Sequence, residues 1–411
     1  MTMLFLKNAT IIDGTGADPV SNGAVVVEDD RIKEVLRGPS GWVPSDAQTI
    51  DCRNQTLLPG LIDVHVHVGA VDANIMEQQR LYHPSMLVIR SLKVIQEALD
   101  QGFTTIRDAG GADAGIREAQ RQGLIPGPRM FISGYALSQT GGHGDSRLPT
   151  EIRSPSQDLA GVAARICDGV DEVRRAVREQ LRRGADFIKV MGGGGCMSPG
   201  DEIDTSQYSP DELRAAVFEA EAVGTYVAAH VYSSRSIRNC VSSGVRSLEH
   251  GNLMDESAAK AIKDAGAFLV PTLVTYEMIS RMGKSMGIPE NNVRKINEAR
   301  DRGLEALAIA KRVGVKIASG SDLLGPMQRH KGMELELKAR VLGPMGAIVA
   351  TTKTNAELLK KEKDLGTIEV GKLADFILVR GDPLKDITLI QNYQEKISLI
   401  VQAGRVYKNI L

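Results

Sequence analysis

Eight short apolar segments alternate with helical segments between about residue 60 and residue 360. Parallel strands need a crossover connection, usually a helix, so repeated β-then-α units build either an open doubly wound sheet or a closed barrel. Eight units favour an α/β fold with a closed (β/α)8 barrel of the TIM type, although an open sheet also fits the strand count. The predicted strands are 61–68, 104–109, 129–134, 187–192, 226–231, 247–251, 268–272 and 316–321.

The helical segments carry recognisable start and stop signals. In the segment 209–224, Ser209 is the expected N-cap, Pro210 the first helical residue and Glu212 the capping-box partner. Gly224 then ends the helix. A second helix, over 170–183, has its apolar residues on one face and its charged residues on the other.

The two ends of the chain have a different pattern, with short strands separated by turns. Each end is too small to bury a core alone. We therefore predict that residues 1–58 and 362–411 join into one small β-sandwich domain, and that residues 59–361 form the barrel between them.

Composition and charge exclude several classes of function. Lys and Arg number 50 and Asp and Glu number 51, so no charge excess points to nucleic acid. The N-terminus lacks the apolar core and cleavage site of a signal peptide, and no stretch approaches the roughly 20 apolar residues of a membrane span. The four scattered cysteines favour a reducing compartment. We expect a cytoplasmic homo-oligomer that acts on a small molecule, without membrane or nucleic-acid partners.

Histidine and aspartate side chains stand at the ends of several predicted strands, where barrel enzymes place their chemistry. His65 and His67 in LIDVHVHVGA are two residues apart, so both imidazoles lie on one face of a strand. Alone, this pair fits a hydrogen-bonded polar face as well as a metal site. His230, His250 and Asp322 end three further strands, and imidazole and carboxylate are suitable zinc ligands. The set favours metal ligands.

Lys189, on the strand 187–192, needs a separate explanation because an ammonium group has no lone pair. Burial and neighbouring positive charge lower the pKa of a lysine. A neutral amine can then take up carbon dioxide as a carbamate, an anion able to bridge two metals. The alternative is a strand-end lysine that extends to solvent. Beside four histidines and an aspartate, we favour the carbamate.

Several motifs resemble known metal-site motifs. LLPGLIDVHVHV, FIKVMG, AAHVYS, SLEHGN and ASGSDLLG are similar to those of the amidohydrolase superfamily, and the match covers essentially the whole chain. RDAGGAD, ALSQTGGHGD and VPTLVTYE resemble its imidazolonepropionase-like branch. That branch includes Xaa-Pro dipeptidases, carboxypeptidases that release a C-terminal amino acid, and enzymes that cleave N-acyl amino acids.

The resemblance implies a binuclear zinc centre with carbon dioxide bound as N6-carboxylysine at Lys189, which bridges the metals. A hydroxide between the metals would attack the amide of a dipeptide or N-acyl amino acid. Asp322 would accept its proton and deliver it to the leaving nitrogen. The implied ligands are His65, His67 and Asp322 for one metal, and His230 and His250 for the other.

Two further residues are candidates for contact with substrate. His143 lies in a glycine-rich loop after the third strand, and the resemblance suggests a catalytic role near the substrate carboxylate or the tetrahedral oxyanion. An exposed loop histidine is the alternative. The phenol of Tyr232 could donate to a substrate carboxylate, or could simply pack at the barrel rim. Arg107 and Asp108 are expected in internal ion pairing rather than in contact with substrate.

Other functions are less favoured. The glycine run at 192–195 lacks the lysine and hydroxyl residue of a P-loop, so flexible backbone near the metals is the preferred interpretation. Ser233 stands where superfamily deaminases carry an acidic residue, so amide hydrolysis is favoured. A cyclic amidase or lactonase, opening an imidazolone or hydantoin ring, is the enzymatic alternative. A non-enzymatic barrel scaffold would be expected to lack ligands. Side-chain preference depends on the loops 139–160, 192–207 and 323–335.

Overall fold

The computed structural model describes residues 3–38, 47–152 and 161–411. Part of the loop 139–160, and parts of the predicted small domain, therefore lie outside the described residues. The chain divides into two compact units. The first holds residues up to Asp63, Gln96–Thr105 and His330–Leu411, and the second holds Val64–Ile95 and Ile106–Arg329.

The first unit combines strands from both ends of the chain in one sheet. Among the described residues its order is β18-β17-β16-β5-β1-β2-β3, with β4 beside β1. β5 and β16 pair antiparallel, with Leu58 opposite Ile377, and Leu6, Leu57 and Phe376 share one core. The strands are β1 (Met3–Ile11), β2 (Val20–Glu28), β3 (Arg31–Leu36), β4 (Ala47–Asp51), β5 (Thr56–Pro59), β16 (Phe376–Val379), β17 (Ile397–Gln402) and β18 (Arg405–Asn409).

The first unit extends beyond the predicted small domain. It also contains the helices α10 (Met333–Val349) and α11 (Asn355–Leu358), whereas α12 (Tyr393–Lys396) lies within the predicted segment 362–411. The boundaries at residues 58 and 362, and the sandwich arrangement, stay predictions.

The second unit is built on parallel strands. Within the described part of the chain, β10-β9-β11-β12-β13-β14-β15 form a parallel sheet, and β6-β7-β8 form a second sheet. The strands are β6 (Leu61–Val66) and β7 (Phe103–Asp108), whose first three residues each belong to the first unit, and β8 (Arg129–Ile132), β9 (Ala136–Ser138), β10 (Ala164–Ile166), β11 (Ile188–Met191), β12 (Val227–Ser233), β13 (Ser247–Leu253), β14 (Phe268–Val270) and β15 (Lys316–Ile317). Each predicted strand segment overlaps one of these strands, which confirms the α/β class. Closure into a barrel stays a prediction.

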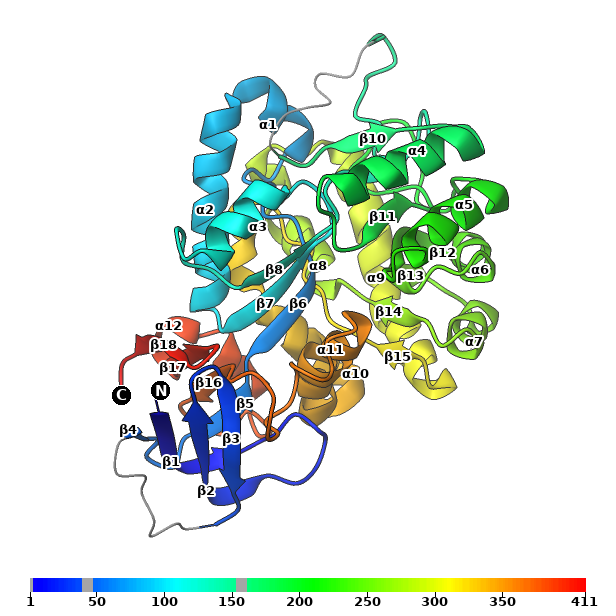
Figure 1. Ribbon diagram of the computed structural model, residues 1–411. Coiled ribbons are helices and arrows are strands. Elements are labelled where there is room, and N and C mark those ends of the chain that lie inside the picture. The colour runs from blue at the N-terminus through cyan, green and yellow to red at the C-terminus, as the bar shows by residue number, and fades with distance from the viewer. Residues whose placement is uncertain (1–2, 39–46, 153–160) are drawn as a thin grey trace. The chain divides into compact units, whose positions relative to one another are not determined.

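Helices follow the parallel strands, as the β-then-α pattern predicts. α4, α5, α6 and α7 lie in a row along one side of β11 to β14 (Figure 1). At the start of α5, the Ser209 hydroxyl and the Glu212 carboxylate form the predicted capping box. The helices are α1 (Ile75–Leu81), α2 (Pro84–Asp100), α3 (Ala114–Arg121), α4 (Gly169–Arg182), α5 (Pro210–Glu221), α6 (Ser234–Ser242), α7 (Glu256–Asp264), α8 (Leu273–Met282) and α9 (Glu290–Val313).

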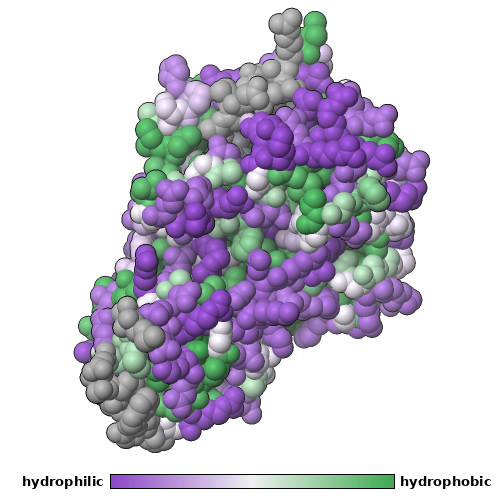
Figure 2. Space-filling model, viewed as in Figure 1, coloured by the Kyte–Doolittle hydropathy of each residue, from purple (hydrophilic) through white to green (hydrophobic). Residues whose placement is uncertain are grey.

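The face of the molecule seen in Figure 2 is mostly polar. Hydrophilic residues cover most of the face seen in Figure 2, with smaller hydrophobic areas between them. Among the described residues, no helix combines the length and the apolar character that crossing a membrane requires.

Strand register brings the candidate site residues to one edge of the parallel sheet. Met191 of β11 is opposite His230 of β12, and Val231 is opposite His250 of β13. Lys189 lies two residues before Met191 on β11. The carboxyl ends of β11, β12 and β13 therefore present Lys189, His230 and His250 to the same region.

The segment after β15 runs against β6. The amide of Asp322 donates to the carbonyl of His65 at 2.8 Å. A Cβ placed on Gly320 would lie only 2.4 Å from the Cβ of His65, so this approach requires a residue without a side chain. Gly320 thus allows two of the candidate ligands to meet.

We predict that Gly320→Ala lowers the free energy of unfolding by about 1–3 kcal/mol, because the new methyl group forces β6 and the 320 segment apart. Chemical denaturation measures the change. Gly200→Ala is the matched control, because a Cβ there meets no atom within 4 Å. Equal stabilities for the two variants would contradict the close-packing argument.

Candidate metal centre

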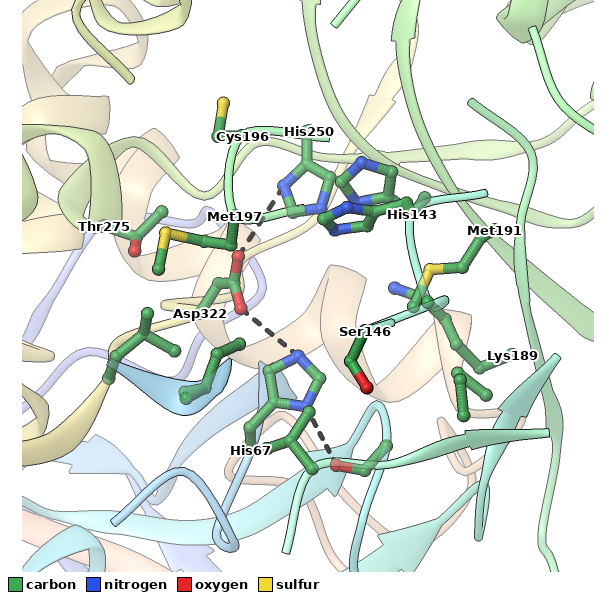
Figure 3. A pocket seen from close by; sticks show the side chains of 18 of the residues that line it. His67, His143, Ser146, Lys189, Met191, Cys196, Met197, His250, Thr275 and Asp322 are labelled. Carbon is green, nitrogen blue, oxygen red and sulfur yellow. Dashed lines mark hydrogen bonds and ion pairs between the residues drawn. The ribbon is translucent and has the colours of Figure 1, made fainter. Parts of the chain in front are cut away.

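Asp322 lies between two histidines that come from β6 and its C-terminal end. Its Oδ1 atom is 3.6 Å from Nε2 of His65 and 3.3 Å from Nε2 of His67. Its Oδ2 atom is 4.0 Å from Nδ1 of His250, and Figure 3 shows the carboxylate between His67 and His250. His65, His250 and Asp322 each offer a ligand atom, and these atoms lie within 4.8 Å of one another. The structure therefore brings these predicted ligands together.

The donor atoms of this group fit a cation. Nδ1 of His65 donates to the Glu249 carboxylate at 2.8 Å, and Nδ1 of His67 donates to the Gly110 carbonyl at 2.9 Å. In a neutral imidazole the other nitrogen then carries a lone pair. Nε2 of His65 and Nε2 of His67 face the same carboxylate oxygen of Asp322. Burial opposes a proton on His67, but the hydrogen bond with Asp322 and its negative charge raise the pKa of His67, so a proton or a metal cation can stabilise this contact.

Burial keeps three of the histidines in the form that binds metal. It lowers the pKa of His65 and of His230 well below the usual value, and lowers the pKa of His250 to about 3. Burial acts in the opposite direction on Asp322, but the electrostatic influence of the neighbouring His65 and the hydrogen bond with His67 hold the pKa of that carboxyl below its usual range. Neutral imidazoles and an ionised carboxylate are the states a divalent metal needs.

Two of these residues have unusual backbone angles. His250 has φ of 77° and Asp322 has φ of 52°, both in the left-handed region that residues with side chains avoid. Such conformations persist only where surrounding contacts enforce them, and they gather at functional sites.

Lys189 lines the same pocket and is 1 % exposed. Burial is the main cause that lowers its pKa to about 8. A fraction of this amine is therefore neutral near physiological pH, as the carbamate hypothesis requires.

His230 and His143 stack on one another, with ring centroids 4.1 Å apart. Nε2 of His230 is 3.0 Å from the Gly194 carbonyl, which leaves Nδ1 as the nitrogen with a lone pair. Nδ1 of His143 is 2.9 Å from the Ser198 hydroxyl, and burial lowers the pKa of His143 to about 4. The structure thus places His143 in the pocket, beside a candidate ligand.

A chain of hydrogen bonds connects His250 to Tyr232. Nδ1 of His250 is 2.7 Å from the Thr272 hydroxyl, which lies 3.5 Å from the phenol of Tyr276. The Tyr276 phenol donates to Tyr232 at 2.9 Å, and the Cys196 thiol donates to the same Tyr232 oxygen at 3.4 Å. Tyr276 is a site residue that the sequence analysis missed. It belongs to the motif VPTLVTYE, but nothing in the spacing indicated that it meets Tyr232.

Arg107 supports the site from behind, as an internal residue. It pairs with Glu249 at 2.7 Å, and both side chains are fully buried. Asp108 instead accepts hydrogen bonds from the amides of Val68, Gly110 and Ala112. Glu249, which orients His65, was also missed, although an acid inside the apolar strand SLEHG was a usable signal.

The glycines at 192–195 provide space rather than unusual backbone angles. None of the four has positive φ. A Cβ on Gly195 would lie 1.9 Å from Nδ1 of His143, and one on Gly194 would lie 2.0 Å from the Glu202 carbonyl oxygen. Close packing against the site, rather than flexibility, explains this run.

The candidate ligands open into a pocket of about 1170 Å³, a volume that includes its solvent-open part. Polar groups form one part of its lining, as the labelled residues of Figure 3 show. Apolar side chains form another part: Ile75, Met191, Met197, Ile279, Ile296 and Leu324.

Comparison with known proteins places this site in a family. Residues 56–406 match the model of the amidohydrolase family. The ochratoxinase of Aspergillus niger is 33% identical over 413 residues, which cover 97% of this chain and 85% of that protein. A solved structure of a prolidase complexed with N-methylphosphonate-L-proline is 42% identical, with a TM-score of 0.96 and complete coverage of both chains.

A Xaa-Pro dipeptidase solved with bound methionine is 29% identical, with a TM-score of 0.90, and the match covers 99% of this chain and 100% of that one. These relatives lie in the dipeptidase-like branch that the motifs indicated, so the predicted resemblance is confirmed. The chain therefore belongs to the amidohydrolase family, and it is a hydrolase of carbon–nitrogen bonds.

Proposed function

We propose that this hydrolase holds two zinc ions and cleaves the amide bond of a dipeptide or N-acyl amino acid, releasing the C-terminal amino acid. The observation that carries the proposal is the convergence of Asp322 with histidines from three strands in one buried pocket. His65, His67 and Asp322 would hold one ion, and His230 and His250 the other. Bound there, the ions would polarise the substrate carbonyl and acidify a water molecule.

The carboxylated form of Lys189 would bridge the two zinc ions. Its burial and its lowered pKa support uptake of carbon dioxide by the amine. The added carboxylate would also compensate part of the positive charge of the two ions.

Asp322 would move the proton. Its carboxylate is ionised and faces the ligands with both oxygens, so it can accept a proton from the attacking water. It can then deliver that proton to the leaving nitrogen, which an amine needs in order to depart.

Tyr232 and His143 would bind the substrate carboxylate or the oxyanion. The Tyr232 oxygen accepts hydrogen bonds from Tyr276 and Cys196, so its own proton is available for another acceptor. His143 lines the same pocket. The apolar wall at Met191, Met197 and Ile279 supports an uncharged substrate side chain.

The finer architecture is part of the same proposal. The Val64 amide bonds the Ser319 carbonyl at 3.0 Å and the Asp186 amide bonds the Ile132 carbonyl at 2.7 Å, contacts that support closure of the strands into a (β/α)8 barrel. The four cysteines are buried and free, which supports a cytoplasmic location.

We predict that the zinc-loaded enzyme releases free C-terminal amino acids from a mixed library of dipeptides and N-acyl amino acids. Mass spectrometry of the products identifies the preferred residue. Metal-stripped enzyme is the control, with zinc and bicarbonate restoring turnover. Ring opening of hydantoins or imidazolones without any amino-acid release would contradict the proposal and favour a cyclic amidase.

Asp322→Asn should lower kcat by about 100- to 10,000-fold, because the amide cannot accept and return a proton. Zinc content, measured by plasma emission, should stay near that of the parent, since an amide oxygen can still face the ions. Asp264→Asn, which changes only an exposed ion pair with Lys260, is the matched control. Parent-like kcat in Asp322→Asn would remove this residue as proton carrier.

Tyr232→Phe should raise KM by about 10- to 100-fold, the cost of one hydrogen bond to a charged group, with a smaller effect on kcat. Steady-state kinetics with the preferred substrate measures both constants. Tyr82→Phe is the control, because its phenol bonds Asp72 outside the pocket lining. An unchanged KM in Tyr232→Phe would leave this tyrosine a packing residue.

A further inference from the structure

The loop Gly192–Ser198 is buried although it has almost no regular secondary structure. A buried loop exposes backbone carbonyl and amide groups that water cannot reach, so each needs a partner within the protein.

Lys295 of α9 supplies three of them. Its side chain is fully buried, and its ammonium donates to the carbonyls of Gly195 at 3.0 Å, Ser198 at 2.8 Å and Asp201 at 3.0 Å. All three donors of an ammonium group are thereby used. One turn earlier on α9, the Asn292 amide donates to the Cys196 carbonyl at 2.8 Å.

A carboxylate holds the same loop from within. Asp201 accepts hydrogen bonds from the Ser198 hydroxyl, from the Gly195 amide at 3.2 Å and from the Gln207 side chain at 2.7 Å. The loop is therefore held by two charged groups. The Lys295 ammonium donates hydrogen bonds to loop carbonyls, and the Asp201 carboxylate accepts hydrogen bonds from loop donors.

The other side of the loop contacts three rings of the pocket. The Ser198 hydroxyl meets Nδ1 of His143 at 2.9 Å, and the Gly194 carbonyl meets Nε2 of His230 at 3.0 Å. The Cys196 thiol meets the Tyr232 phenol at 3.4 Å. Displacement of this loop would therefore move the groups that hydrogen-bond to the His143, His230 and Tyr232 rings.

We propose that Lys295 is a positioning residue, which holds the loop Gly192–Asp201 from α9 so that the loop fixes His143 and Tyr232 in the substrate pocket. The claim that Lys295 orders the loop rests on its observed contacts and does not depend on the proposed function. The consequence for substrate binding rests on the proposed function.

Lys295→Met, which keeps the length of the side chain but removes its charge and donors, tests this inference in the zinc-loaded protein. Hydrogen–deuterium exchange should rise in residues 192–201 and stay near parent levels in the rest of the chain. KM should rise about 10- to 100-fold, with kcat less affected and zinc content unchanged, because the ligands on the strands stay in place.

Arg302→Met is the matched control, because it removes an exposed charge from the same helix, where Arg302 forms an exposed ion pair with Glu305 at 3.4 Å. Its loop exchange and kinetic constants should equal those of the parent. Asn292→Ala serves as a second variant if Lys295→Met does not fold, and should show the same pattern with smaller changes.

Parent-like hydrogen exchange of the loop in a folded Lys295→Met would overturn the inference. If Lys295→Met does not fold, parent-like exchange of the loop in Asn292→Ala would overturn it. So would raised exchange with an unchanged KM. If the parent cleaves no member of the library, the proposed function fails, and exchange of the loop alone decides whether Lys295 orders it.

Discussion

The structure depends on a contact that is unfavourable without a positive charge. The carboxylate of Asp322 faces the Nε2 atoms of His65 and His67, whose protons are committed to Glu249 and Gly110 on the opposite side. Burial opposes protonation of His65, whereas Asp322 raises the pKa of His67, so the positive charge can be a proton on His67 or a metal ion. A metal ion satisfies the carboxylate and both lone pairs together. His250 and Asp322 adopt left-handed backbone angles in this arrangement. Such angles lower the stability of the fold, and side-chain packing alone does not require them at these two positions.

The supporting groups explain how such a site survives in a folded protein. Arg107 and Glu249 form a fully buried pair, and Glu249 also receives the His65 proton. A buried carboxylate with only one of these partners would be strongly destabilising. The candidate metal ligands and the buried ion pair are therefore one network, and an isolated change at Arg107 reaches the candidate metal centre through Glu249 and His65.

The features that the sequence predicted are those that depend on local pattern. Eight strands follow from apolar periodicity, and His65, His67, His230 and His250 stand out because strand ends in such folds share one edge. Tyr276, Glu249 and Lys295 were missed because their roles depend on which element packs against which. The spacing between Lys295 and the Gly195 carbonyl is 100 residues, and no periodicity connects them. β9 and β10 were also missed, and β10 has the charged Arg165 between its two apolar residues, so it shows no apolar run.

The pocket contains two kinds of residue, which differ in how the fold holds them in place. Lys189 and the candidate histidine ligands lie on or directly after strands of the parallel scaffold, and the main-chain amide of Asp322 bonds the His65 carbonyl on β6. The groups proposed to meet substrate depend instead on side-chain contacts from loops and helices, such as Ser198 to His143 and Tyr276 to Tyr232. Strand-held ligands cannot move without loss of the sheet, whereas the loop contacts can change one at a time. Substrate preference can therefore vary between relatives while the hydrolytic centre stays the same, and it is the loop Gly192–Asp201 and its anchor on α9 that should differ between relatives with different substrates.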